Sequence, residues 1–212
     1  MSERRRTSRF VIPSYTHGVF RQLQDVCVEK IHGDLVTLIS EHPMQPLEQL
    51  LLELPRALGL RSVVQVEVLG CATVWSGDTR RYRIGVRKDG PIDLPVLLPP
   101  KSRFNPPAAS LPALGVLIRR IPVEISDVST AGCQLQSTEP LIEGAVGQLE
   151  VAMDGEVHQE PIRVCRTSHA PGASRSWRAG TTFLALSAPA PASVRNVVAR
   201  FEIIDELAGR FR

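Results

Sequence analysis

A stretch rich in proline divides the chain into two halves, and no other feature restricts the possible folds as much. Proline lacks a backbone N–H and fixes φ, so a dense run of prolines cannot join a continuous β-ladder and is typical of an extended linker. We therefore predict a domain at residues 1–89, a Pro-rich linker at 90–112 and a second domain at 113–212. The prolines of the linker are Pro91, Pro95, Pro99, Pro100, Pro106, Pro107 and Pro112.

Both halves consist mainly of short runs in which polar and apolar residues alternate and β-branched side chains are common. This pattern predicts β-strands. The leucines of the run at 48–55 also fit a short helix, and we prefer a strand that ends at Pro55. The predicted fold class is therefore all-β, with strands at 26–39, 48–55, 62–75, 80–88, 115–129, 132–137, 147–155, 160–168 and 176–186.

The two halves also share a series of short matches that occur in the same order. "TSRFVIP" (7–13) recurs as "KSRFNPP" (101–107), and Cys71 falls opposite Cys165 when the later strands are aligned. Such self-similarity indicates a degenerate repeat, so we predict two related β-domains.

A minor helical element is expected at the end of the second domain. Apolar residues between 193 and 208 recur at i, i+3, i+4 and i+7, which predicts an amphipathic α-helix, and Pro191 suits its first turn. The polar face carries acidic residues rather than a row of lysines, so we expect the helix to pack on the second domain and not on a membrane. Its apolar positions are Val194, Val197, Val198, Phe201, Ile204 and Leu207.

Composition and spacing argue against several classes of function. No run approaches the ~18 apolar residues of a membrane span, and no apolar segment follows the charged N-terminus, so we expect a cytoplasmic protein without membrane insertion. The four cysteines and five histidines show no metal-ligand spacing, and no nucleophile elbow, P-loop or dinucleotide fingerprint occurs. We predict no enzymatic activity, no metal and no cofactor. The formal net charge of +3 implies no broad nucleic-acid surface, so we expect no DNA or RNA partner.

Two polar features stand out against this background. Arg4, Arg5, Arg6 and Arg9 crowd the N-terminus, where they either grip an anionic ligand or form a solvated basic tail. In "EISDVSTAGCQLQ" (124–136), an aspartate, a serine and a glycine interrupt an alternating strand, although Asp and Gly are unfavourable in strands. Either the interruption is a tight turn whose polar side chains bond to nearby backbone, or it is part of a ligand site.

These two features together resemble the PilZ domain family. Asp127, Ser129 and Gly132 match its Asp-x-Ser-x-x-Gly element, and Arg5 and Arg9 match its Arg-x-x-x-Arg element. The resemblance implies small antiparallel β-barrels with a C-terminal helix and, in many members, binding of cyclic di-GMP. For this chain it implies two such barrels joined by the Pro-rich linker.

The resemblance also implies a role for each motif residue. Arginines can clamp the phosphates of cyclic di-GMP bidentately and stack on its guanines. The Asp127 carboxylate can accept from guanine N–H donors, and the Ser129 hydroxyl can serve phosphate or base. Gly132 allows a backbone geometry or a close approach that a Cβ would block.

The chain departs from the family pattern because its complete Arg-x-x-x-Arg element lies in the first predicted domain and its complete Asp-x-Ser-x-x-Gly element lies in the second. In the first domain, "EKIHGD" (29–34) places Ile31 where the serine would stand, and in the second, "PPKSR" (99–103) keeps only Arg103 of the arginine pair. Three alternatives follow. Arg103 with Lys101 is sufficient to bind the phosphates, or Arg5 and Arg9 cross to the second barrel, or ligand binding has been lost. We expect the first barrel to serve docking or oligomerisation rather than ligand binding.

Two functions are consistent with these residues. The first is a cyclic di-GMP effector that relays the level of this second messenger to a protein partner. The alternative is a PilZ-like adaptor that binds protein partners without nucleotide and keeps the motif residues for turn structure. A homodimer is compatible with both.

Overall fold

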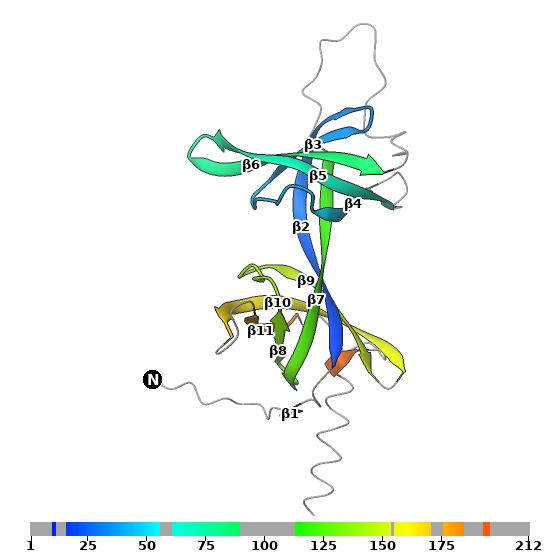
Figure 1. Ribbon diagram of the computed structural model, residues 1–212, viewed down its shortest axis with the longest axis vertical. Coiled ribbons are helices and arrows are strands. Elements are labelled where there is room, and N and C mark those ends of the chain that lie inside the picture. The colour runs from blue at the N-terminus through cyan, green and yellow to red at the C-terminus, as the bar shows by residue number, and fades with distance from the viewer. Residues whose placement is uncertain are drawn as a thin grey trace, which may run out of the picture. The chain divides into compact units, whose positions relative to one another are not determined.

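The computed structural model describes residues 10–11, 16–55, 61–89, 113–153, 155–170, 176–184 and 193–195. Every predicted strand run overlaps an observed strand, so the all-β prediction is confirmed (Figure 1). The predicted linker at 90–112 and all but residues 193–195 of the predicted helix lie outside the described residues. The strands are β1 (Phe10–Val11), β2 (His17–His32), β3 (Leu35–Ser40), β4 (Gln49–Pro55), β5 (Arg61–Ser76), β6 (Thr79–Asp89), β7 (Ala113–Ser129), β8 (Gly132–Ser137), β9 (Val146–Met153), β10 (Glu156–His169) and β11 (Trp177–Phe183).

The chain forms two compact units. The central unit is Leu23–Arg119, and the terminal unit combines Met1–Gln22 with Arg120–Arg212. The divisions fall inside the long strands β2 and β7, so each of these strands contributes residues to both units. The predicted domain boundaries at 89/90 and 112/113 border residues that are not described, and they stay a prediction.

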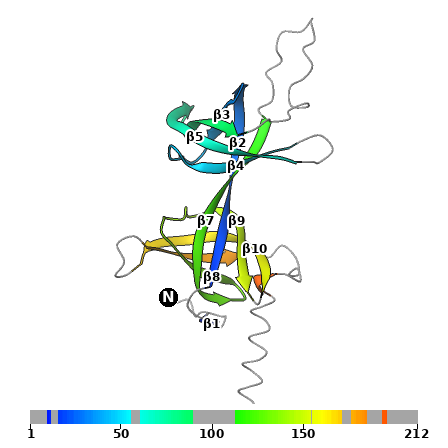
Figure 2. The same ribbon diagram turned by 45° about the vertical axis from the view of Figure 1, so that its right-hand side comes forward.

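The central unit is built from β2 to β6 and the first part of β7. Its strands follow the order β7-β4-β5-β6-β3-β2, and neighbouring strands in this order pair antiparallel. Figure 2 labels β2, β3, β4, β5 and β7 of this unit. Alternate residues of each strand point inward, as the sequence pattern predicts for strands with one buried face. The core consists of Val26, Val28, Val36, Leu38, Met44, Leu50, Leu52, Leu54, Val64, Val66, Val68, Ile84, Val86 and Leu117.

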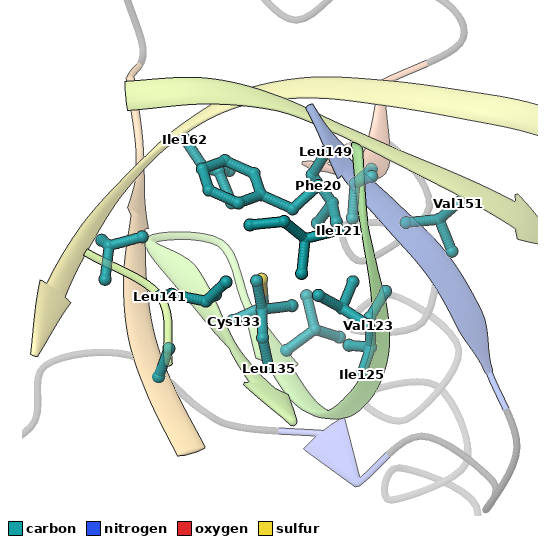
Figure 3. Close-up of a cluster of buried hydrophobic side chains, with 14 of the residues drawn as sticks. Phe20, Ile121, Val123, Ile125, Cys133, Leu135, Leu141, Leu149, Val151 and Ile162 are labelled. Carbon is teal, nitrogen blue, oxygen red and sulfur yellow. The ribbon is translucent and has the colours of Figure 1, made fainter. Parts of the chain in front are cut away.

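The terminal unit repeats this order of pairings, with β8 to β11 in place of β3 to β6 and with β2 and β7 exchanged. Its order is β2-β9-β10-β11-β8, and β7 pairs with both β8 and β2. If β2 to β6 are matched to β7 to β11, the two units have the same neighbour relations, which agrees with the degenerate repeat seen in the sequence. The core of this unit, shown in part in Figure 3, consists of Phe20, Ile121, Val123, Ile125, Val128, Cys133, Leu135, Leu141, Leu149, Val151, Ile162, Val164, Ala179, Phe183 and Val194.

One predicted strand is wrong in its extent. The run at 26–39 was expected to be continuous, but it forms the end of β2, a turn and then β3. Gly33 occupies the turn with φ of 59°, a conformation that favours glycine, and His32 pairs with Leu35 across it. The dipeptide Gly33–Asp34 is thus a hairpin signal within a run of strand-forming residues.

No helix within the described part of the chain has the length and apolar character needed to span a membrane.

Candidate functional site

The Asp-x-Ser-x-x-Gly element forms the tip of the β7–β8 hairpin. Asp127 and Ser129 are close to the end of β7, Thr130 and Ala131 make the turn, and Gly132 begins β8. Ser129 is directly paired with Gly132 across the turn. A bulge between Ile125 and Asp127 shifts the register just before the motif.

The hydroxyl of Ser129 is used within the hairpin itself. Its Oγ donates to the carbonyl oxygen of Gly132 at 3.1 Å and accepts from the N–H of Ala131 at 3.3 Å. The side chain is buried, with 5% of the residue exposed. The presence of a serine at this position is therefore explained by the turn.

Gly132 is required by close packing against β11. A Cβ added at this position would lie 2.0 Å from the carbonyl oxygen of Thr181 and 2.9 Å from the Cα of Thr182. Both contacts are with backbone atoms, which cannot move aside as a flexible side chain could. No side chain larger than hydrogen fits here without a shift of β11.

The residue after the glycine continues this packing into the core. Thr181 Oγ1 donates to the Cys133 carbonyl at 3.0 Å and accepts from the Cys133 N–H at 3.3 Å. Burial raises the pKa of the Cys133 thiol to about 12. The charges of Asp127 and Glu160 also raise this pKa, whereas the hydrogen bond to Thr181 lowers it. The thiol is therefore neutral at physiological pH and has a structural place in the core.

Asp127 differs from the other two motif residues because it is partly exposed on the outer face of the sheet. Its strand neighbour on one side is β1, in which Val11 pairs with Asp127 and Phe10 pairs with Val128. Arg9 is covalently bonded to Phe10, and consecutive Cα atoms lie about 3.8 Å apart. Arg5, Arg9 and Arg103 themselves lie outside the described residues.

A row of paired residues extends from Asp127 across three further strands. Asp127 pairs with Gln134 on β8, Gln134 with Gly180 on β11, and Gly180 with Arg166 on β10. Directly paired residues project to the same face of a sheet. None of the four is buried, so this row lies on the outer face of the terminal unit, on the strands labelled in Figure 1.

Arg166 extends along this row towards Asp127. A Cβ built on Gly180 would lie 3.0 Å from Nε and 3.2 Å from Cγ of Arg166, so the arginine side chain crosses the space that glycine leaves open. The guanidinium is thereby directed over β11 and not away from the sheet. Sequence reasoning missed Arg166 and Gln134, because only the register of four strands brings them into line with Asp127.

A separate pocket lies at the other end of the β7–β8 pair. It has a volume of about 220 Å³ and is lined by His17, Glu124, Gln136 and Ser137 among others, but not by the three motif residues. Within the described part of the chain, no group of His, Cys, Asp or Glu side chains could hold a metal ion. The motif and its row therefore form the candidate site.

No protein-family model and no curated protein sequence matches this chain. Similar solved structures include Escherichia coli YcgR in complex with c-di-GMP, at 15% identity and a TM-score of 0.33, covering 90% of this chain and 85% of YcgR. MrkH of K. pneumonia in its apo state is similar at 12% identity and a TM-score of 0.32, covering 91% and 88%. PlzA of Borreliella burgdorferi in complex with c-di-GMP is similar at 9% identity and a TM-score of 0.27, covering 87% and 90%. At such TM-scores these likenesses assign neither a fold family nor a function to this chain.

Proposed function

We propose that the terminal unit binds cyclic di-GMP on the outer face of β7, β8, β11 and β10, and that binding alters the contact of this protein with a protein partner. The pairing of β1 with β7 carries the proposal. Arg9 directly precedes Phe10 in the sequence, and Phe10 and Val11 pair with Val128 and Asp127 of the second motif. The crossing of the N-terminal arginines to the second motif is thus the alternative that the strand pairing favours.

The chemistry of this face suits a ligand with two phosphates and two guanines. Arg5 and Arg9 supply bidentate donors for the phosphates, and Asp127 accepts from guanine N–H groups. The Arg166 side chain passes over Gly180, where it can stack on a base or pair with a phosphate. Ser129 and Gly132 then act by holding the hairpin that presents Asp127.

We also infer that each unit is a small β-barrel. The order β7-β4-β5-β6-β3-β2 returns to β7 through the pairing of β7 with β2, and the order β2-β9-β10-β11-β8-β7 returns to β2 through the same pairing. In such a cycle every strand has two neighbours, as in a closed barrel.

Loss of a motif residue should weaken binding in a calorimetric titration with cyclic di-GMP. Arg9→Ala and Asp127→Ala should each raise the Kd at least about tenfold, since a bond to a charged group is worth roughly 1.5–3 kcal/mol. Arg6→Ala is the matched control, because it removes a charge from the same tail but not from the motif. Arg103→Ala tests the competing source of arginine. If Arg103→Ala abolishes binding and Arg9→Ala does not, the N-terminal arginines are not the clamp.

Arg166→Ala should also raise the Kd for cyclic di-GMP, by about five- to tenfold, because it removes one guanidinium from the proposed binding face. Arg87→Ala is the control, since Arg87 is an exposed strand arginine of the central unit that pairs with Glu67. Circular dichroism should show that both variants keep the wild-type fold. An Arg166→Ala variant with wild-type affinity would exclude this residue from the site.

The alternative function keeps one specific observation in its favour. The hairpin alone accounts for both Ser129 and Gly132, so these residues are also required in an adaptor that binds no nucleotide. If the full chain shows no binding at millimolar cyclic di-GMP, the receptor proposal fails and the adaptor takes its place.

A further inference from the structure

The outer part of β5 has a strand partner on one side only. β6 pairs with β5 from Gln65 to Ser76, whereas β4 pairs with β5 only from Arg61 to Glu67. Two further backbone bonds join Val68 to the residues just before β4, and the ladder on that side then ends. Within the described residues, no strand covers the other side of Leu69–Ser76.

Apart from the bulge at Leu69, this edge lacks the features that normally protect an exposed strand. In an antiparallel pair, alternate residues direct their N–H and C=O groups away from the partner, so the free side of β5 presents a row of unpaired donors and acceptors. Charged residues, prolines or short length usually prevent such an edge from pairing with another chain. The stretch "LGCATVWS" (69–76) contains no charged residue and no proline.

Apolar side chains are exposed along the same stretch. Trp75 is 69% exposed and Leu69 is 44% exposed, although both residue types are favoured in buried positions. Trp75 pairs with Arg80 on β6, and the neighbouring pair on that face is Thr73 with Tyr82. The Arg80 guanidinium lies 5.1 Å from the centre of the Tyr82 ring. The arginine thus covers the tyrosine and leaves the tryptophan open.

We propose that this edge is where a second copy of the chain docks, by antiparallel pairing of the two β5 strands across a two-fold axis. A strand paired with its own copy meets the same pattern of donors and acceptors, and the symmetry closes the assembly as a dimer. No charged residue lies between Leu69 and Ser76, so two copies of this edge meet without like-charge repulsion. Arg80 stands on β6, which pairs with the opposite side of β5, so it does not lie between the two edges.

The geometry of such a pair is defined by its axis. A two-fold axis perpendicular to the sheet sets one residue of β5 opposite itself. If that residue is Thr73, at the middle of the edge, Trp75 lies opposite Cys71 of the second copy. The indole then covers the partly exposed Cys71 and loses much of its contact with water.

The oligomeric state of the full chain tests this proposal. Sedimentation velocity over a range of concentrations should show a monomer–dimer equilibrium for the wild type. Thr73→Lys should weaken the dimer at least about tenfold, because two lysines would face each other across the axis. Gln65→Lys is the matched control and should dimerise as the wild type does, since Gln65 is exposed on the same strand but paired on both sides.

A cross-link provides a second measurement if the lysine variant folds poorly. Thr73→Cys should give a disulfide-linked dimer under mild oxidation, and far more of it than the wild type, because opposite residues in an antiparallel pair have Cα atoms within disulfide range. A protein that is monomeric at every concentration would overturn the proposal. A dimer that is unaffected by Thr73→Lys and not cross-linked through Thr73→Cys would overturn it equally.

Discussion

Replacing Gly132 with alanine should lower the free energy of unfolding of the terminal unit by about 3 kcal/mol or more. A new Cβ would stand 2.0 Å from the Thr181 carbonyl oxygen, so either the β8–β11 pairing opens or the core around Cys133 shifts. Overpacking of this kind commonly costs ~1–3 kcal/mol, and a clash with backbone belongs to the upper end. Urea denaturation followed by circular dichroism measures the effect.

Gly85→Ala is the matched control for this prediction. Gly85 also lies in a strand, but a Cβ added there would have no atom within 4 Å. Alanine at this position should therefore leave stability unchanged or raise it slightly, because glycine costs conformational entropy on folding. If Gly132→Ala unfolds at the same urea concentration as the wild type, β11 has room to move, and the glycine serves something other than packing.

The strands could be predicted from the sequence because their burial alternates. In β5, for example, Ser62, Val64, Val66 and Val68 are buried while the residues between them are more exposed, and the same period is visible in the letters. The Gly33 turn was missed because valine, leucine and isoleucine surround it. The first residues of β2 were missed because polar residues stand where the pattern requires apolar ones. Gln22 and Gln24 occupy inward positions, with 3% and 7% of the residue exposed.

Gln24 shows what compensates for a polar residue at such a position. Its side-chain amide donates to Ser40 Oγ and to the His42 carbonyl, both contributed by β3 and the segment after it. A buried amide is tolerated when its hydrogen bonds are made within the protein. Those partners lie 16 and 18 residues after Gln24 in the sequence, so a local sequence pattern cannot predict them.

The internal repeat was predicted correctly in outline but not in register. In the observed hairpins, the pair His32–Leu35 corresponds to the pair Ser129–Gly132. His32, and not Ile31, therefore corresponds to the motif serine. Likewise, the extra residue of the β5–β6 bulge is Leu69 and that of the β10–β11 bulge is Cys165. Cys71 is therefore two positions away from a true counterpart of Cys165. Bulges shift alignments by single residues, and composition does not reveal them.

Half of the candidate site could be predicted and half could not. Asp127, Ser129 and Gly132 form a contiguous motif, which a sequence displays directly. The alignment of Arg166 with Asp127 depends on three strand pairings and on the absence of a side chain at Gly180. The proximity of β1 to Asp127 depends on only two paired residues, which are too few to give a strand signal.

A buried ion pair in the terminal unit should produce the other large effect on stability. Glu160 on β10 is 1% exposed, and its carboxylate accepts from Arg195 Nε at 2.7 Å and from the hydroxyl of Ser193. The N–H of Arg195 donates to the same Ser193 Oγ at 3.1 Å, and Val194 between them is part of the core. These contacts join residues 193–195 to β10.

Arg195→Ala should therefore lower the free energy of unfolding by roughly 3–5 kcal/mol, because it leaves a buried carboxylate without its counter-charge. Arg21→Ala is the control. Arg21 pairs with Glu150 at 3.0 Å in the same unit, but the two side chains are 34% and 20% exposed, so its loss should cost about 1 kcal/mol or less. Thermal and urea unfolding of both variants measure the difference.

The double variant Glu160→Met with Arg195→Met separates charge from packing. If the cost of Arg195→Ala comes from the unpaired carboxylate, removal of both charges should recover most of the lost stability, since apolar side chains can replace a buried ion pair at little cost. If the double variant is as unstable as Arg195→Ala, the loss comes instead from the cap that Ser193 and Arg195 make together. Equal losses for Arg195→Ala and Arg21→Ala would mean that Glu160 gains access to water once its arginine is gone, and that residues 193–195 contribute little to holding the terminal unit together.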